Sequence, residues 1–229
     1  MMGARFDAVL FDAGGVLVLP DPTVLAPLLA PYGGDTSIVA HRRAHYAAMA
    51  AKSRVRSAEW DWNAYNLAYV DSVGCRSGIR EHAAEVLDHT RSAHLWRWAI
   101  PETMAALSTL AAAGVPMGVV SNASGQIEAV LRHTEVCAID DGCGVRMRVI
   151  VDSHVVGVAK PDPRIFDHAL GHFAEFDRQR IAYVGDSVAM DVAAARGAGL
   201  HPLLVDPYGD HEGADYETIR SVEDVVSMI

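Results

Sequence analysis

The sequence predicts an α/β protein, with a Rossmann-like, doubly wound parallel sheet as its core and an α-helical domain inserted into it. Three observations carry this prediction. Short segments that are apolar throughout end in polar residues, helical segments alternate with them, and residues 20–100 break this alternation. Strands covered by helices on both faces are apolar on both faces, and repeated strand–helix units form parallel sheets.

The predicted strands are five apolar runs, each short enough for a buried strand. They span residues 8–11, 115–120, 149–151, 181–184 and 201–205. The first, second and fourth are followed directly by Asp12, by Ser121 and Asn122, and by Gly185 and Asp186. Chemistry is therefore expected where these strands end.

Three helices are predicted between the strands. Residues 101–113 begin with proline and are followed by Gly114, the usual asymmetry of helix ends. A second helix is predicted for residues 161–173, again opened by proline, and a third for residues 191–198. Ser187 is a candidate N-cap for the third helix, because a serine hydroxyl accepts from free amides of the first turn.

Residues 20–100 show alanine-rich helical periodicity in segments 25–30, 38–52, 61–73 and 79–92. All four tryptophans lie here, as the pairs Trp60 and Trp62, and Trp96 and Trp98. Residues two apart do not share a helix face, so packing is favoured over a substrate platform. The predicted domains are a core made of residues 1–19 and 101–229, and a helical domain made of residues 20–100.

Composition narrows the choice of partners and location. The 229 residues include 19 Lys and Arg against 29 Asp and Glu, a formal net charge of −10, which disfavours nucleic acid. Glycine, proline and polar residues interrupt the longest uncharged stretch, so no membrane span is predicted. Asp7 interrupts the apolar residues near the N-terminus, unlike a signal peptide, and a cytoplasmic location is expected. A homodimer is compatible with the sequence but not indicated by it.

The three cysteines do not suggest a disulfide framework or a zinc site. They are Cys75, Cys137 and Cys143, an odd number without CxxC spacing. Idle thiols are the favoured interpretation.

The polar residues at the strand ends form a candidate site. In an open parallel sheet, ligands bind outside the carboxyl ends of the strands. The residues expected there are Asp12, Ser121, Asn122, Lys160, Asp186 and Asp191. Carboxylates beside an ammonium group suit Mg²⁺ and a phosphate, and a carboxylate such as that of Asp12 can attack phosphorus once these cations neutralise the phosphate charge.

Four segments in order resemble the motifs of the haloacid dehalogenase superfamily of hydrolases, most of which are Mg²⁺-dependent phosphatases. They are residues 11–17 (FDAGGVL), 119–122 (VVSN), 157–166 (GVAKPDPRIF) and 183–191 (YVGDSVAMD). The likeness spans residues 5–205, and it implies that the helical insertion is a cap over the site.

The resemblance also implies roles for individual residues. Asp12 would be the nucleophile and a Mg²⁺ ligand, and Lys160 would steady both nucleophile and phosphate. The phosphoryl group would be bound by Ser121, with Asn122 beside it. The remaining metal ligands would be the backbone carbonyl of Gly14, Asp186, and Asp191 directly or through water. The expected function is Mg²⁺-dependent hydrolysis of a small phosphorylated metabolite through an aspartyl-phosphate intermediate.

One position departs from the phosphatase pattern: Gly14 stands where these enzymes usually carry the aspartate that acts as acid and base. Losing such a group costs roughly 10²- to 10⁴-fold in rate. Several alternatives stay open. The leaving group could need little protonation, as in an acyl phosphate or an anomeric sugar phosphate. His41, His45 or a water beside Gly14 could act instead. The protein could also be a catalytically weakened phosphate-binding or regulatory module.

A dehalogenase is the rival within the same superfamily. That branch resembles the pattern Asp-x-Tyr in the first motif and lacks the carboxylates of the fourth. The sequence has Gly14 in the first motif and keeps Asp186 and Asp191, which disfavours dehalogenation.

Overall fold

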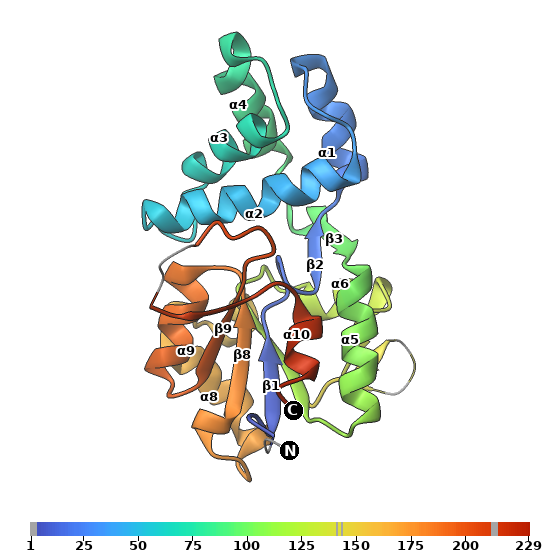
Figure 1. Ribbon diagram of the computed structural model, residues 1–229, viewed down its shortest axis with the longest axis vertical. Helices are drawn as coiled ribbons and strands as arrows, with labels where there is room; N and C mark the ends of the chain where they lie inside the picture. Colours follow the sequence, from blue (N-terminus) through green and yellow to red (C-terminus); the bar gives the residue numbers. More distant parts are fainter. Residues whose placement is uncertain (1–3, 141, 143, 212–214) are drawn as a thin grey trace.

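The core is a six-stranded sheet in the order β10-β9-β8-β1-β4-β7, with every neighbouring pair parallel (Figure 1). The computed structural model describes residues 4–140, 142, 144–211 and 215–229. The strands are β1 (Ala8–Phe11), β4 (Met117–Ser121), β7 (Ile150–Asp152), β8 (Ile181–Gly185), β9 (His201–Val205) and β10 (Glu217–Ile219). The predicted doubly wound parallel sheet is confirmed. Only β10 was not anticipated, because its three residues include two polar ones.

Helices cover both faces of this sheet and form two separate apolar layers. They are α5 (Pro101–Ala112), α6 (Ile127–His133), α7 (Ser153–Val156), α8 (Asp167–Leu170), α9 (Ala193–Gly197) and α10 (Val222–Val226). Along β1, Val9 and Phe11 join the layer of α5, α6 and α10, whereas Ala8 and Leu10 join the layer of α8 and α9. Successive side chains of a strand point to opposite faces, so an all-apolar strand is what this two-sided covering requires.

Two predicted helices are shorter and less regular than expected. Residues 161–173 form a 3-10 turn (Pro163–Phe166), then α8, then a second 3-10 turn (Gly171–Phe173). The 191–198 segment begins earlier, with a π-helical turn over Val188–Val192 that leads into α9. Ser187 caps it as predicted, its hydroxyl accepting from the amide of Met190 at 3.4 Å.

Four helices form the insertion and lie beyond the carboxyl end of the sheet (Figure 1). They are α1 (Pro22–Leu29), α2 (Ile38–Arg54), α3 (Asn63–Ser72) and α4 (Arg80–Thr90), and they share an apolar cluster of their own. Its two connections to the core pair as an antiparallel ribbon, β2 (Val18–Pro20) with β3 (Trp96–Ala99), which was not predicted. A second small pair, β5 (Cys137–Ala138) with β6 (Val145–Arg146), was also missed. The domain division at residues 19/20 and 100/101 stays a prediction.

Within the described part of the chain, no helix has the length and apolar character needed to cross a membrane. Cys75 and Cys137 are free thiols, and burial raises the pKa of Cys137 to about 12. Cys143 lies outside the described residues.

Candidate functional site

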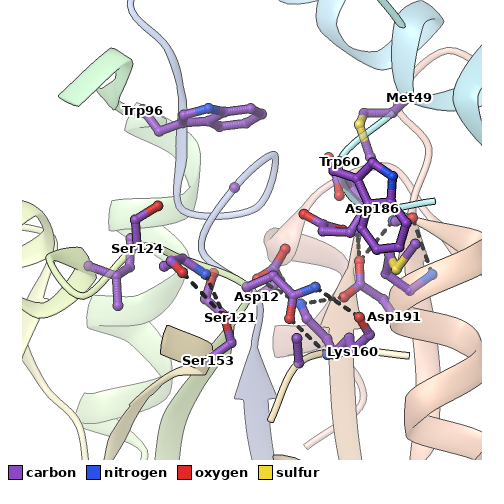
Figure 2. A pocket seen from close by; sticks show the side chains of 18 of the residues that line it. Asp12, Met49, Trp60, Trp96, Ser121, Ser124, Ser153, Lys160, Asp186 and Asp191 are labelled. Atoms are coloured by element: carbon purple, nitrogen blue, oxygen red, sulfur yellow. Dashed lines mark hydrogen bonds and ion pairs between the residues drawn. The ribbon is translucent and has the colours of Figure 1, made fainter. Parts of the chain in front are cut away.

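The strand register brings the predicted site residues to one edge of the sheet. Phe11, the last residue of β1, is aligned with Val119 of β4 and Val184 of β8. The next residues along these strands therefore meet at the same edge, where Figure 2 shows Asp12 between Ser121 on one side and Lys160, Asp186 and Asp191 on the other. The buried side chains there are those of Asp12, Ser121, Lys160, Asp186 and Asp191.

Lys160 is the centre of this group. Its Nζ lies 2.9 Å from Asp12 Oδ1 and 2.6 Å from Asp191 Oδ1, and it donates to the hydroxyl of Tyr183 at 2.8 Å. Burial alone would lower the pKa of Lys160, but the carboxylates of Asp12 and Asp191 raise it above its usual value. Lys160 is therefore a permanently charged ammonium held against Asp12.

Asp12 is a buried carboxylate that the protein satisfies only in part. Burial raises the pKa of Asp12 to about 7. The charge of Lys160 opposes this shift, whereas the charges of Asp191 and Asp186 add to it by smaller amounts. Asp12 Oδ1 is buried against Lys160 at 2.9 Å, and no other described residue donates a hydrogen bond to it. Because a carboxylate has about four acceptor positions, Asp12 keeps acceptor capacity for a cation or an electrophile.

Asp191 accepts from several donors. Its Oδ1 accepts from Lys160 at 2.6 Å, and its Oδ2 accepts from the backbone amides of Asp186 at 3.0 Å and Ser187 at 2.8 Å. The single hydroxyl hydrogen of Tyr183 is shared between Asp191 Oδ1 at 3.1 Å and the Val120 carbonyl at 2.9 Å, so Asp191 keeps acceptor capacity on Oδ1. The π-helical turn explains how Asp191 reaches back to this loop, and Gly185 permits it, because a Cβ there would lie 2.3 Å from Asp191.

Asp12, Asp186 and Asp191 each offer a carboxylate oxygen, and these atoms lie within 4.8 Å of one another. Burial, followed by the charge of Asp191, raises the pKa of Asp186 well above its usual value. Three carboxylates this close repel one another, and Lys160 neutralises only part of their charge. The group is therefore suited to hold a cation with oxygen ligands.

The helical insertion reaches this site through α2. His45 is buried, with Nε2 3.0 Å from Asp186 Oδ2 and Nδ1 3.0 Å from the hydroxyl of Tyr65. Burial lowers the pKa of His45 to about 3, so the ring is neutral. The next residue, Tyr46, donates to the carbonyl of Gly15 at 2.8 Å. Only glycine fits at position 15, because φ is +71° and a Cβ would lie 1.9 Å from Asp186 Oδ2.

The other predicted histidine lies elsewhere. The ring nitrogens of His41 are 2.8 Å from the hydroxyl of Tyr69 and 3.0 Å from the carbonyl of Asp35, both within the insertion. Burial lowers the pKa of His41 as well. The structure therefore places His41 in the packing of the insertion, and His45 against a predicted metal ligand.

Ser121 and Asn122 both line a cavity above the carboxylates, but they make different contacts. Asn122 is tied to the backbone of Lys160: its Nδ2 donates to the Lys160 carbonyl at 3.0 Å, and its Oδ1 accepts from the Lys160 amide at 2.8 Å. This pair of bonds fixes the loop that carries Lys160. Ser121 is buried at the end of β4, next to Asp12 (Figure 2).

The position of Gly14 is covered by Trp96. A Cβ at residue 14 would lie 3.1 Å from Cζ3 and 3.2 Å from Cε3 of the indole. Figure 2 shows the Trp96 ring lying over the strand end that carries Asp12. An aromatic ring from β3 therefore faces the space beside Gly14, where a water is one of the alternatives for the missing acid and base.

A cavity of about 380 Å³ opens above the carboxylates. From the insertion, the following residues line it: Met49, Lys52, Glu59, Trp60, Trp62, Arg91, Ser92 and Trp96. Three of the four tryptophans thus contribute to the wall. Trp62, Trp96 and Trp98 also pack against the apolar clusters, as expected, whereas Trp60 is 84% exposed and does not. The position of Lys52 on the cavity side could have been found from the sequence, because His45, Met49 and Lys52 follow helical spacing and share a face of α2.

Known proteins resemble this chain in fold and in part of its sequence. The structure of an HAD phosphatase from Thermococcus onnurineus superposes with a TM-score of 0.58 at 22% identity over 97% of both chains. A 2-haloacid dehalogenase structure from Pseudomonas syringae gives 0.53 at 20% identity, also over 97% of both chains. These likenesses show the fold.

A curated relative, the haloacid dehalogenase-like hydrolase domain-containing protein 3 of Bos taurus, is 36% identical over 94 residues, which are 40% of this chain. The match spans about a third of that relative's length, 34%. A family model described as haloacid dehalogenase-like hydrolase matches residues 6–199. The chain therefore belongs to the haloacid dehalogenase-like hydrolase family.

Proposed function

We propose that the protein is a Mg²⁺-dependent phosphatase that hydrolyses a small phosphorylated molecule through an aspartyl-phosphate on Asp12. The observation that carries the proposal is the buried arrangement of Asp12 against Lys160, with Asp191 holding the lysine from the other side. The similarity to a solved phosphatase supports it. We further propose that helices α1–α4 act as a cap that excludes water from the reacting centre.

The residues present fit Mg²⁺. Asp12 and Asp186 are buried, and each offers an oxygen to the same group of three carboxylates, whose charge the single ammonium of Lys160 balances only in part. Hard oxygen ligands of this kind suit Mg²⁺, which usually keeps several waters. We propose Asp12, Asp186 and the Gly14 carbonyl as ligands, with Asp191 directly or through water, while Asp191 also holds Lys160 and the loop of Asp186. Bound there, the ion would withdraw charge from the phosphate oxygens.

Asp12 would act first as the nucleophile. One carboxylate oxygen bonds to phosphorus as the bond from phosphorus to the leaving-group oxygen breaks. Lys160 lowers the repulsion between the carboxylate and the phosphate dianion, and Ser121 is placed to donate to a phosphoryl oxygen. Water then attacks the phosphorus of the aspartyl-phosphate, which releases inorganic phosphate and restores Asp12.

The leaving-group oxygen would receive no proton from residue 14. Gly14 has no side chain, and Trp96 faces its position. His45 is neutral and bound to Asp186 and Tyr65. We therefore propose substrates whose leaving group is stable without early protonation, such as an acyl phosphate or an anomeric sugar phosphate.

The test measures phosphate release with Mg²⁺ from acetyl phosphate, glucose 1-phosphate and an alkyl phosphate, together with mass spectrometry of the acid-quenched protein. We expect release from the first two and a phosphate adduct on the peptide that contains Asp12. Absence of both, with retained phosphate binding, would favour a binding or regulatory module. Halide release from a 2-haloacid without phosphatase activity would instead favour dehalogenation.

Residue 14 allows a second prediction. Gly14→Asp alone is expected to give no gain on the alkyl phosphate, because the indole of Trp96 faces the new side chain. Gly14→Asp combined with Trp96→Leu is expected to gain about 10²-fold or more on that substrate, the range for a positioned general acid. Acetyl phosphate hydrolysis should change much less, and Trp96→Leu alone serves as the control. A comparable gain from Gly14→Asp alone would contradict the proposed obstruction.

A further inference from the structure

Two cations of the insertion stand on the cavity wall against one tryptophan. Lys52 Nζ lies 3.6 Å from the ring centroid of Trp62, and Arg91 Cζ lies 3.9 Å from it. All three residues line the cavity above Asp12. The indole face therefore gathers two positive charges at the end of the cavity formed by the insertion.

Neither cation is paired with a carboxylate among the described residues. Lys52 is 4% exposed and donates to the backbone carbonyl of Glu59 at 2.8 Å. Arg91 donates through Nη2 to the side-chain oxygen of Asn66, and its Nε is buried without a hydrogen bond. Burial lowers the pKa of Lys52 and of Arg91. Lys52 is buried and Arg91 is half-buried, and a cation removed from water without a counter-charge is costly, so a partner anion from outside the chain is the missing element.

The helix α2 relates these cations to the proposed phosphate site. His45 touches Asp186, and Lys52 follows it by seven residues on the same helical face. Two turns of helix advance by about 10 Å at 1.5 Å per residue. The cavity thus offers a second polar end at roughly this distance from the carboxylates, and Met49 and the tryptophans also line it.

The charges of the two ends differ. At the core end, three carboxylates face Lys160, and a divalent cation would balance the excess. At the insertion end, Lys52 and Arg91 face the cavity, and Glu59 is the only acidic residue that the described insertion adds to the wall. A substrate spanning both ends would meet positive charge twice, once through the metal and Lys160 and once through Lys52 and Arg91.

We propose that Lys52 and Arg91 form an anion subsite that selects phosphomonoesters whose leaving group ends in a second anionic group, a phosphate or a carboxylate. The inference rests on the proposed phosphatase function, because it assigns the first phosphate to Asp12 and the metal. The aromatic wall then covers the apolar spacer between the two anions. This accounts for a cavity that combines cations and tryptophans in an acidic protein.

The test measures binding without turnover. Asp12→Asn protein with Mg²⁺ is titrated calorimetrically with 1,4-butanediol bisphosphate and with 4-hydroxybutyl phosphate, which differ only in the second phosphate. We expect the bisphosphate to bind about 10- to 100-fold more tightly, the size of a charge-assisted hydrogen bond. A third titration with 4-phosphooxybutanoate shows whether carboxylate serves as well as phosphate.

Variants in the same background assign the preference. Lys52→Met and Arg91→Met should each reduce it, whereas Arg80→Met should not, because Arg80 is a surface cation of α4 paired with Asp71 and outside the cavity. Equal affinity for the two ligands, no binding, or a preference that survives both substitutions would overturn the subsite. Loss of affinity for both ligands alike would show a merely structural role and overturn it too. If phosphate release fails but the preference stands, only the phosphatase proposal falls.

Discussion

Asp12→Asn is expected to reduce phosphate release from acetyl phosphate by about 10⁴- to 10⁶-fold, the range seen when a covalent nucleophile is removed. An amide oxygen of similar size retains the shape of the site but attacks phosphorus poorly. The same substitution removes a buried charge. Because burial raises the pKa of Asp12 to about 7, its ionised form is disfavoured in the folded protein, and the metal-free variant should be no less stable at pH 8.

The expected loss of activity without a loss of stability separates function from folding. Phosphate release measures the activity, and thermal unfolding in EDTA measures the stability. Asp162→Asn is the matched control, since Asp162 caps the turn just after Lys160 and asparagine caps equally well. It should retain activity close to that of the unmodified protein. Residual activity of Asp12→Asn within tenfold would contradict the nucleophile role.

The sheet was predictable from the sequence because β1 and β8 are buried at every residue, on both faces, and so are apolar throughout. The edge strand β10 and the β2–β3 ribbon were not, since a segment of three or four residues is too short to show a period. The helix predicted for residues 161–173 is less regular in the structure than the sequence suggests. Proline at its start gave a strong signal, whereas the 3-10 turns on either side of α8 depend on tertiary packing.

The candidate site was predictable as a set but not in its connections. Parallel strands end together, so Asp12, Ser121 and Asp186 had to meet. No pattern showed that Asn122 would hold the backbone of Lys160, or that Trp96 would cover Gly14, because both contacts join residues far apart in the chain. The same holds for Lys52: its helical face is legible in the sequence, but the cavity it faces is set by the docking of the insertion on the core.

Lys160→Met is expected to lower the free energy of unfolding by about 3–5 kcal/mol in EDTA, as when one partner of a buried ion pair is removed. The substitution leaves the carboxylates of Asp12 and Asp191 buried without their cation. It should also reduce phosphate release by about 10²-fold or more, because the charge that stabilises the transferring phosphoryl group is lost. Added Mg²⁺ should restore part of the stability, since it binds the folded state.

Lys52→Met is the matched comparison, because it removes a second buried lysine, one that no carboxylate of the described residues pairs with. Lys52 is 4% exposed and its ammonium donates to one backbone carbonyl, so methionine relieves an unpaired charge while losing one hydrogen bond and the contact with Trp62. These effects oppose each other, and the change in unfolding free energy should stay within about 1 kcal/mol. Urea unfolding of both variants measures the difference. Similar losses would mean that burial alone, rather than the carboxylates around Lys160, decides what each lysine contributes.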